Sequence, residues 1–311
     1  MKIRSDESPQ HTIAAVARDT GVNKDTLRAW ERRYGYPVPS RDANGERVYS
    51  AAEVQRLQLV KRLMDNGHRP GRLLALTPPA LQALAEQAAP PSPRGAGVAP
   101  DGEAVQDCLR LVQALDVGAL RQRLAREAAA RGLAQFVTAL VVPLNQAVGD
   151  AWLRGELPVY QEHLYTQALL SVLYQALAGL APAPASARPR VLLATLPGEP
   201  HGLGLLMAEL MFALEGARCL SLGVQTPLDE LVRAAQAFDA DIVALSFSGC
   251  TSPHQTVDNL RELRAALPPS RALWAGGREP VLQRRPLPQV TVVDRLEGLT
   301  LALQAWRNVA P

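Results

Sequence analysis

The stretch that decides the fold of the longest segment reads VLLATLPGEPHGLGLLMAEL, residues 191–210. It begins with a short apolar run, passes through a loop rich in Gly and Pro, and continues as an apolar stretch with helical spacing. A buried strand, a loop and a helix in this order predict the first unit of a parallel sheet. Because ligands of such sheets bind at the carboxyl ends of the strands, the loop after residue 194 is a candidate site.

The same alternation continues to residue 293. Further short apolar runs occupy residues 218–222, 242–246, 272–275 and 290–293, and helical stretches of about 10 to 15 residues separate them. Parallel strands with right-handed crossovers follow from this pattern. We therefore predict a flavodoxin-like (Rossmann-like), doubly wound domain over residues 190–311.

Two linkers divide the rest of the chain. Residues 88–100 and 181–189 are too rich in Pro, Gly and Ala to pack well. Between them, residues 101–180 are rich in Leu and Ala with helical periodicity, which predicts a helical bundle. With a first domain over residues 1–87, the predicted class is an α plus α/β multidomain protein.

Composition excludes several classes of protein. No run of about 18 apolar residues occurs, and residues 1–7 lack the apolar stretch of a secretion signal. The three cysteines are far apart and form no Cys-x-x-Cys pair, which argues against a disulfide framework or a structural zinc site. We expect a cytoplasmic protein without a membrane partner.

The first segment carries the positive charge. Residues 1–85 hold 14 Lys and Arg against 9 Asp and Glu, although the whole chain has a net charge of only +3. Two short helices joined at Gly21 predict a helix-turn-helix, and Asn23 is a good cap for its second helix. Lys24, Arg28 and Arg32 recur every four residues and form a basic stripe on that helix. Such a stripe is suited to contacting bases and phosphates.

Residues 37–49 predict a wing after this helix. Asn44-Gly45 is a hairpin turn signal, flanked by Arg41 and Arg47. Ser50 and Glu53 then form a capping box at the start of a third helix.

Here the chain resembles the MerR family of winged helix-turn-helix transcription regulators. The motifs that carry the resemblance are LRAWERRYG at residues 27–35 and GERVYS at residues 45–50, with Pro37, Arg41 and Val54. The resemblance implies binding to operator DNA through Lys24, Arg28, Arg32, Arg41, Arg47 and Tyr49. Since a Pro-rich linker replaces the family's long dimerisation helix, we expect the later segments to form the homo-oligomer.

The loop 197–204 is open to two interpretations on its residues alone. Nicotinamide binding is disfavoured, because Met207 replaces the third glycine of a dinucleotide loop. His201 is then either a surface histidine of the loop or a metal ligand whose second ring nitrogen is oriented by Glu199.

This loop resembles the cobalamin-binding signature, normally Asp-x-His-x-x-Gly, with Glu199, His201 and Gly204 in its positions. The resemblance implies that His201 ligates the cobalt of cobalamin. Ser246 and Ser248 correspond to the family's Ser-x-Leu, and Gly276 and Gly277 to its Gly-Gly pair, which together accommodate the nucleotide tail. Glu199 and Ser248 depart from the usual residues.

The middle segment resembles light-responsive CarH/LitR-type repressors, because nine residues separate Trp152 from Glu162-His163. The resemblance implies a bundle that covers the cofactor, with Trp152 near the adenosyl group and Glu162 at its ribose. Those repressors have a cobalt-capturing histidine after the Trp, whereas this chain has Leu153, which cannot ligate. Either another histidine such as His163 takes that part, or the photochemistry or the chromophore differs.

These resemblances predict a non-enzymatic, light-responsive repressor that uses adenosylcobalamin and forms a dimer or tetramer. One alternative keeps the architecture but binds biliverdin or another bilin, alone or beside cobalamin, with Cys250 or Cys108 as an attachment point. A further alternative is a cobalamin sensor that does not respond to light, or a corrinoid methyl carrier.

Overall fold

The computed structural model describes residues 10–42, 44–65, 68–88, 100–285 and 287–309. The chain divides into two compact units, each described by itself. One comprises Met1–Arg94 and Asp150–Glu156, and the other comprises Gly95–Gly149 and Leu157–Pro311. The linker expected at residues 88–100 lies almost wholly outside the described residues, whereas residues 181–189 are described and contain neither helix nor strand.

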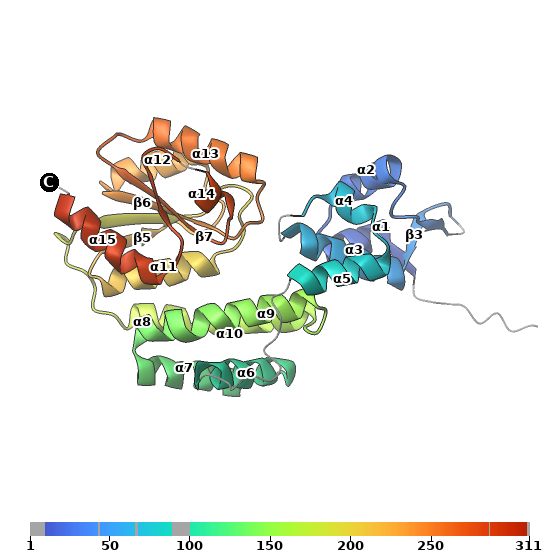
Figure 1. Ribbon diagram of the computed structural model, residues 1–311, viewed down its shortest axis with the longest axis horizontal. Helices are drawn as coiled ribbons and strands as arrows, with labels where there is room; N and C mark the ends of the chain where they lie inside the picture. Colours follow the sequence, from blue (N-terminus) through green and yellow to red (C-terminus); the bar gives the residue numbers. More distant parts are fainter. Residues whose placement is uncertain (1–9, 43, 66–67, 89–99, 286, 310–311) are drawn as a thin grey trace, which may run out of the picture. The chain divides into compact units, whose positions relative to one another are not determined.

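The first unit is a winged helix-turn-helix, as predicted (Figure 1). Its helices are α1 (Ile13–Thr20), α2 (Lys24–Tyr34), α3 (Ala51–Asp65), α4 (Pro70–Leu74) and α5 (Pro78–Ala88). Its three short antiparallel strands lie in the order β1-β3-β2 and are β1 (Gln10–Thr12), β2 (Ser40–Arg41) and β3 (Arg47–Ser50).

The predicted local signals of this unit are confirmed. Gly21 ends α1 with φ 70°, and the side chain of Asn23 accepts a hydrogen bond of 2.7 Å from the backbone N–H of Thr26 at the start of α2. The Ser50 backbone N–H donates to the Glu53 carboxylate at 2.9 Å, while the Glu53 N–H donates to the Ser50 hydroxyl at 3.3 Å. This reciprocal pair is the predicted capping box.

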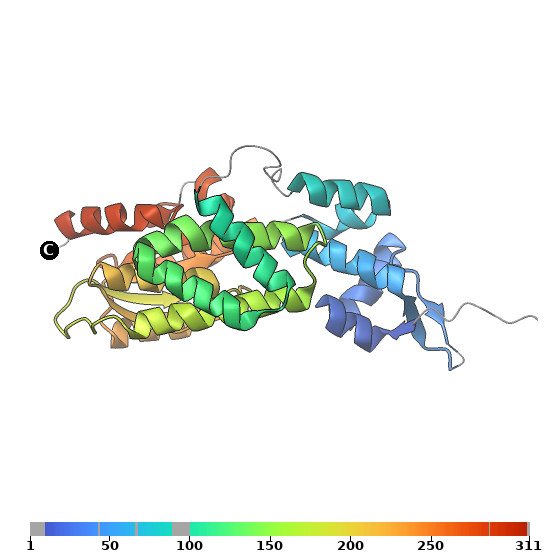
Figure 2. The same ribbon diagram turned by 90° about the horizontal axis from the view of Figure 1, so that it is seen from below.

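The middle segment consists of helices joined by short turns (Figure 2). It contains α6 (Pro100–Gln113), α7 (Val117–Arg131), α8 (Leu133–Gln135), the π-helix η1 (Phe136–Val141), α9 (Val142–Leu153) and α10 (Val159–Ala178). Helices α6, α7 and α10 contact one another, as a bundle requires. The π-helical turn was not predicted, because its apolar residues continue the helical pattern on both sides.

The last segment is a five-stranded parallel sheet in the order β5-β4-β6-β7-β8. Each predicted strand is present, as β4 (Arg190–Ala194), β5 (Arg218–Ser221), β6 (Ile242–Phe247), β7 (Ala272–Gly277) and β8 (Val290–Val293). Helices α11 (Leu203–Leu214), α12 (Leu228–Ala237), α13 (Pro253–Ala266), α14 (Val281–Arg284) and α15 (Glu297–Val309) complete the domain. In Figure 1, α12 and α13 lie on one face of the sheet, and α11 and α15 on the other.

This strand order determines where a ligand can bind. The chain runs outward from β4 to β5 and then returns to the other side of β4 to form β6. The loops that leave β4 and β6 therefore diverge at the carboxyl edge and leave a crevice, the usual ligand position in doubly wound sheets.

Gly276 and Gly277 are required by the sheet itself. A Cβ atom on Gly277, which has φ 117°, would lie 2.0 Å from the backbone oxygen of Phe247 on β6. A Cβ atom on Gly276 would lie 2.9 Å from the backbone oxygen of Val293 on β8. Neighbouring backbones thus approach too closely for a side chain at the end of β7.

We expect Gly277→Ala to lower the free energy of unfolding by roughly 3 kcal/mol or more, because it adds a steric overlap to an unfavourable φ. Gly216→Ala is the matched control: Gly216 has φ 75°, but its added Cβ would meet nothing within 4 Å. That variant should lose only about 1 kcal/mol. Urea unfolding of both full-length variants checks this, and equal losses would contradict it.

Candidate functional site

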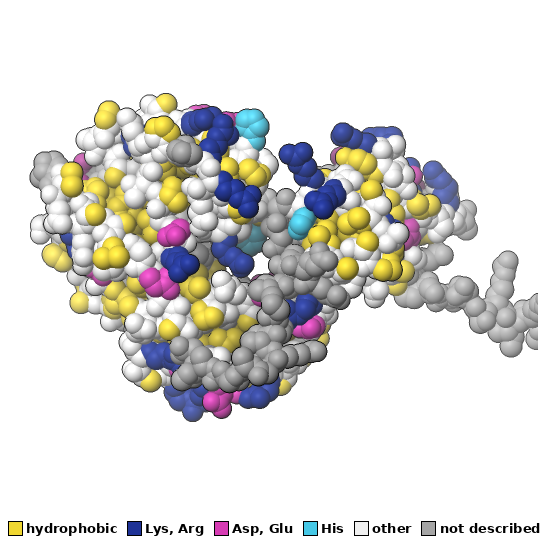
Figure 3. All heavy atoms as spheres, in the orientation of Figure 1, with side chains coloured by type: hydrophobic (Ala, Val, Ile, Leu, Met, Phe, Trp, Pro, Cys, Tyr) yellow, Lys and Arg dark blue, Asp and Glu magenta, His cyan; other side chains and the backbone are white. Residues whose placement is uncertain are grey.

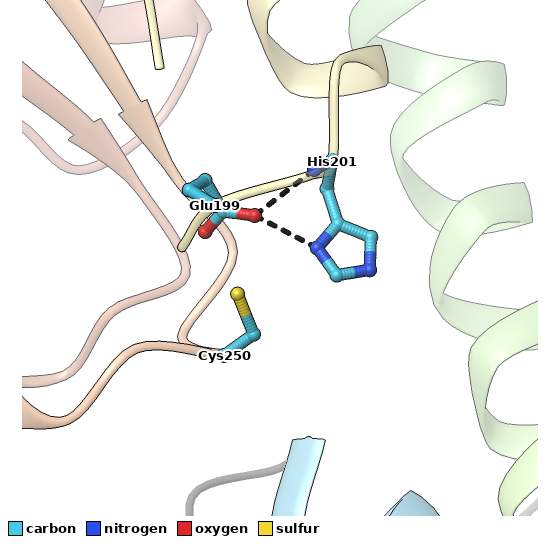
Figure 4. A group of neighbouring side chains, drawn as sticks. All are labelled: Glu199, His201 and Cys250. Atoms are coloured by element: carbon cyan, nitrogen blue, oxygen red, sulfur yellow. Dashed lines mark hydrogen bonds and ion pairs between the residues drawn. The ribbon is translucent and has the colours of Figure 1, made fainter. Parts of the chain in front are cut away.

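The crevice brings together side chains from the loops after β4 and β6. Glu199 and His201 come from the first loop, and Ser248 and Cys250 from the second. Figure 4 shows Glu199, His201 and Cys250 converging on one another. Residues separated by about fifty positions in the sequence thus meet at the carboxyl edge of the sheet.

Glu199 is the centre of this cluster. Its side chain is fully buried, and its carboxylate accepts hydrogen bonds from the Ser248 backbone N–H at 2.7 Å and from the Ser248 hydroxyl at 2.8 Å. It also accepts from the His201 backbone N–H at 3.1 Å and lies 2.7 Å from His201 Nδ1. Burial alone would raise the pKa of Glu199, but the hydrogen bonds from His201 and Ser248 lower it to about 2.

His201 has one constrained and one accessible ring nitrogen. Nδ1 faces Glu199, whereas the opposite edge of the ring, with Nε2, points away from the carboxylate (Figure 4). The side chain is 56% exposed. Hydrogen bonds with Cys250 and then with Glu199 raise the pKa of His201 to about 10. An imidazole held at Nδ1 by a carboxylate is the usual arrangement of a metal ligand that binds through Nε2.

The loop that carries these groups is anchored from within. The Thr195 hydroxyl donates to the Glu199 carbonyl oxygen at 2.6 Å and accepts from the Gln225 N–H at 2.9 Å. Thr195 is fully buried. These two hydrogen bonds fix the path of the loop after β4.

The small residues expected at the nucleotide tail lie close together. A Cβ atom on Gly204 would lie 2.8 Å from the Ser246 hydroxyl, which places the start of α11 against the end of β6. Ser246 is paired with Gly276, and Phe247 with Gly277, across β6 and β7. Ser248 instead bonds to Glu199, an interaction that no spacing in the sequence predicts.

Of the residues expected from the helical segment, two lie together. On α10, Glu162 is half-buried and accepts from the Thr166 hydroxyl at 2.7 Å, and exposed His163 has Nε2 3.7 Å from the Glu162 carboxylate. Trp152 is half-buried near the end of α9 and belongs to the other compact unit. Its approach to Glu162 stays a prediction, and the side chain of Leu153 lies outside the described residues.

The predicted basic stripe is exposed on α2. Lys24, Arg28 and Arg32 are exposed, while Leu27 and Trp30 on the other face are buried. On the face in Figure 3, Lys and Arg side chains gather around α2 and α4. The helix thus has a basic face and an anchored face.

The two arginines of the wing are less available for DNA than expected, because both contact other residues of the protein. Arg41 is exposed, and its guanidinium donates to the Gly45 carbonyl oxygen. Arg47 is half-buried in a salt bridge with Glu31 of α2, with Nε 2.9 Å from a carboxylate oxygen. Glu31 lies within the quoted motif, but its contact with the wing was missed because it depends on how β3 packs against α2.

The structure corrects the prediction for Tyr49. Its side chain is fully buried, and its hydroxyl has no hydrogen-bond partner in the part of the chain that the structure describes. Tyr49 belongs to the hydrophobic core with Leu27, Trp30 and Leu57. It packs β3 against the helices rather than facing a ligand.

Comparisons with known proteins agree with this arrangement. Residues 11–73 match the model of the MerR HTH family regulatory protein, and residues 104–176 and 189–299 match two models of a B12 binding domain. The chain is 34% identical to the HTH-type transcriptional repressor CarH of Myxococcus xanthus over 86% of this chain and 88% of that protein. This chain belongs to the CarH-like family of MerR-type transcription regulators with B12 binding domains.

Two further proteins are similar to this chain, one in sequence and one in fold. The repressor CarA of the same organism is 32% identical over 82% of this chain and 83% of its own length. The monomethylamine corrinoid protein of Methanosarcina barkeri superposes with a TM-score of 0.53, covering 66% of this chain and 99% of that one, at 18% identity. The second likeness shows the fold alone. The predicted family and fold class are thus confirmed, and this regulator binds DNA and cobalamin.

In this regulator, Glu199→Gln should lower the pKa of His201 from about 10 toward its usual 6.5, because a neutral amide stabilises an imidazolium less than a carboxylate does. Between about pH 4.5 and 6.5 the carboxylate is ionised and the imidazole is protonated in folded and unfolded chains, so the pair stabilises the fold fully. This stabilisation is lost as the pH falls through about 2, and it is also lost as the pH rises from 6.5 through about 10. The difference in stability between wild type and Glu199→Gln should therefore shrink over that range.

NMR titration of the imidazole and urea unfolding at several pH values provide the two measurements. Glu199→Asp is the control, since it keeps the charge and should keep the raised pKa. An unchanged His201 pKa in Glu199→Gln would show that the carboxylate does not hold the ring.

The exposed arginines of α2 should carry affinity for DNA. Arg32 forms no ion pair with any other described residue, so Arg32→Ala should weaken binding to a genomic fragment selected by the wild type by about 10-fold. Arg121→Ala removes another exposed arginine, from α7, and should change little. Fluorescence anisotropy measures both, and equal affinities of the two variants would refute the assignment.

Proposed function

We propose that this regulator is a light-responsive transcriptional repressor whose binding to operator DNA is controlled by adenosylcobalamin. The observation that carries the proposal is the Glu199–His201 pair, whose exposed Nε2 edge lies at the carboxyl edge of the sheet. The same chain carries a winged helix with an exposed basic stripe. A ligand site and a DNA-binding surface are therefore joined in one molecule.

The residues of the crevice suit a corrin ring with a nucleotide tail. His201 would ligate cobalt through Nε2, while Glu199 and Ser248 hold the opposite side of the imidazole. Gly204, Ser246, Gly276 and Gly277 offer little side-chain volume beside the expected path of the tail. Cobalamin with an upper adenosyl group supplies a cobalt–carbon bond that light can break.

The helical segment would cover the upper face of the cofactor. By resemblance, Trp152 would lie near the adenosyl group and Glu162 would bind its ribose, with His163 beside it. Asn145 of α9 already contacts the sheet domain, since its Nδ2 lies 3.7 Å from the sulfur of Met207 on α11. A cofactor in this position would add further contacts between helices and sheet.

Assembly would link the cofactor to DNA. A ligand that binds one assembled state more tightly than the free chains raises the population of that state by its differential affinity. Dimers or tetramers would present two or more basic stripes to one operator. Loss of the adenosyl group in light would shift the equilibrium back toward free chains, which would release the DNA.

Leu153 favours a second candidate chromophore, a bilin alone or beside cobalamin, since this chain lacks the histidine next to Trp152. Cys108 is a poor attachment point, because its side chain is fully buried and burial raises the pKa of its thiol to about 11. Cys250 is partly exposed. The absorption spectrum of the isolated protein separates the two chromophores, because only a bilin gives a strong red band.

The test compares four conditions, namely dark and light, each with and without adenosylcobalamin. The proposal predicts that operator DNA is bound in only one of them. Wild-type protein should hold the DNA with adenosylcobalamin in the dark, and release it in light or without cofactor. His201→Ala should lose the effect of cofactor, whereas His254→Ala, which removes an exposed histidine of α13, should keep it. Gel-shift assays give the readout, and equal retention in all four conditions would end the proposal.

A further inference from the structure

We propose that Glu199, His201 and Cys250 form a binding site for a soft divalent cation such as Zn²⁺, and that this site and the cobalamin site exclude each other. The exclusion rests on the function proposed above, whereas the cation site stands on the geometry of the three side chains alone.

The three side chains offer one ligand atom each at close range. A carboxylate oxygen, an imidazole nitrogen and the Cys250 sulfur all lie within 4.8 Å of one another. In Figure 4 the sulfur of Cys250 points toward the space between the other two side chains. Tetrahedral zinc with bonds of about 2.0 to 2.3 Å holds its ligand atoms roughly 3.3 to 3.8 Å apart. The Glu199–His201 contact, at 2.7 Å, must widen to admit the ion, and the Ser248 hydroxyl, 3.0 Å from His201 Nδ1, must give way.

The chemistry of the donor set selects the cation. A thiolate and an imidazole favour Zn²⁺ and Co²⁺ over Mg²⁺ or Ca²⁺, which prefer oxygen ligands. Three protein ligands beside an exposed imidazole leave a fourth position for water, as in open zinc sites. Glu199 also brings a negative charge that is fully buried.

Protons balance the charge of the incoming ion. The Cys250 thiol donates to the Gly198 carbonyl oxygen at 3.3 Å, and the imidazole shares its Nδ1 proton with Glu199. Zn²⁺ would displace both protons to solvent and bind the thiolate sulfur, Nδ1 and the carboxylate. The charge of the cluster stays the same, since one divalent ion replaces two protons.

Displacement of the Nδ1 proton by zinc also explains why the cation site and the cobalamin site exclude each other. Once zinc occupies Nδ1, the remaining proton of the neutral imidazole is on Nε2, which then has no lone pair for cobalt. Glu199 is also withdrawn from its role of orienting the ring. One imidazole therefore serves either zinc through Nδ1 or cobalt through Nε2.

The test uses the full-length chain, freed of metal by a chelator. Wild type should bind one Zn²⁺ per chain in competition with a chromophoric chelator, and Co²⁺ should give a thiolate-to-cobalt charge-transfer band. Cys250→Ser should weaken Zn²⁺ binding at least about 10-fold and abolish that band, since loss of even an outer-shell partner costs about 10- to 100-fold. Cys219→Ser is the matched control, because the thiol of Cys219 contacts the Glu209 and Ala217 carbonyl oxygens outside the cluster.

Cobalamin then separates the two proposals. Zn²⁺ should lower the affinity of wild type for cobalamin, whereas the affinity of Cys250→Ser for cobalamin should be the same with and without Zn²⁺. Urea unfolding of the variant shows whether it folds. Equal Zn²⁺ affinities of the two Ser variants would overturn the cation site, and zinc bound through Cys250 without effect on cobalamin would overturn the exclusion. Zinc binding in a chain that binds no cobalamin would defeat the proposed function and leave the cation site standing.

Discussion

One buried negative charge organises the ligand site. An isolated carboxylate without solvent contact costs several kcal/mol, so Glu199 is compatible with the fold only because donors surround it. These donors are the backbone N–H groups of His201 and Ser248, the Ser248 hydroxyl and the His201 ring. Since they come from the loops after β4 and β6, the charge ties the two sides of the crevice together. The direction of the imidazole follows from the same requirement.

The fold was readable from the sequence wherever local signals and burial agree. Strands of a parallel sheet are covered on both faces, so β4 and β6 appear as short continuous apolar runs, and their bounds were predicted to within a residue or two. β1 was missed because its three residues are mainly polar and are extended only by pairing with β3. The π-helical turn η1 was also not predicted, because the change in its hydrogen bonding does not alter the spacing of the apolar residues.

The site was only partly predictable, because spacing along the chain reports neighbours within one loop and not between loops. Glu199 and His201 are two residues apart, so their pairing followed from the motif. The contact of Ser248 with Glu199 requires the strand order that returns β6 to the side of β4. The same limit explains Arg47, whose salt bridge with Glu31 depends on the packing of the wing. Tyr49 lies in the motif and was predicted to contact DNA, but its position on β3 directs its side chain into the core.

A constraint on regulation follows from the basic face of α2. Lys24, Arg28 and Arg32 are exposed basic side chains of α2 and do not belong to the cluster around His201, so a ligand at His201 changes none of these charges directly. Under the proposed function, control must therefore change how many such faces meet one DNA, or how they are spaced. Moving a two-state equilibrium from 1:99 to 99:1 takes about 5.5 kcal/mol of differential binding energy. Two linked faces also gain affinity by raising each other's effective concentration on the operator, so a modest shift in assembly becomes a large shift in occupancy.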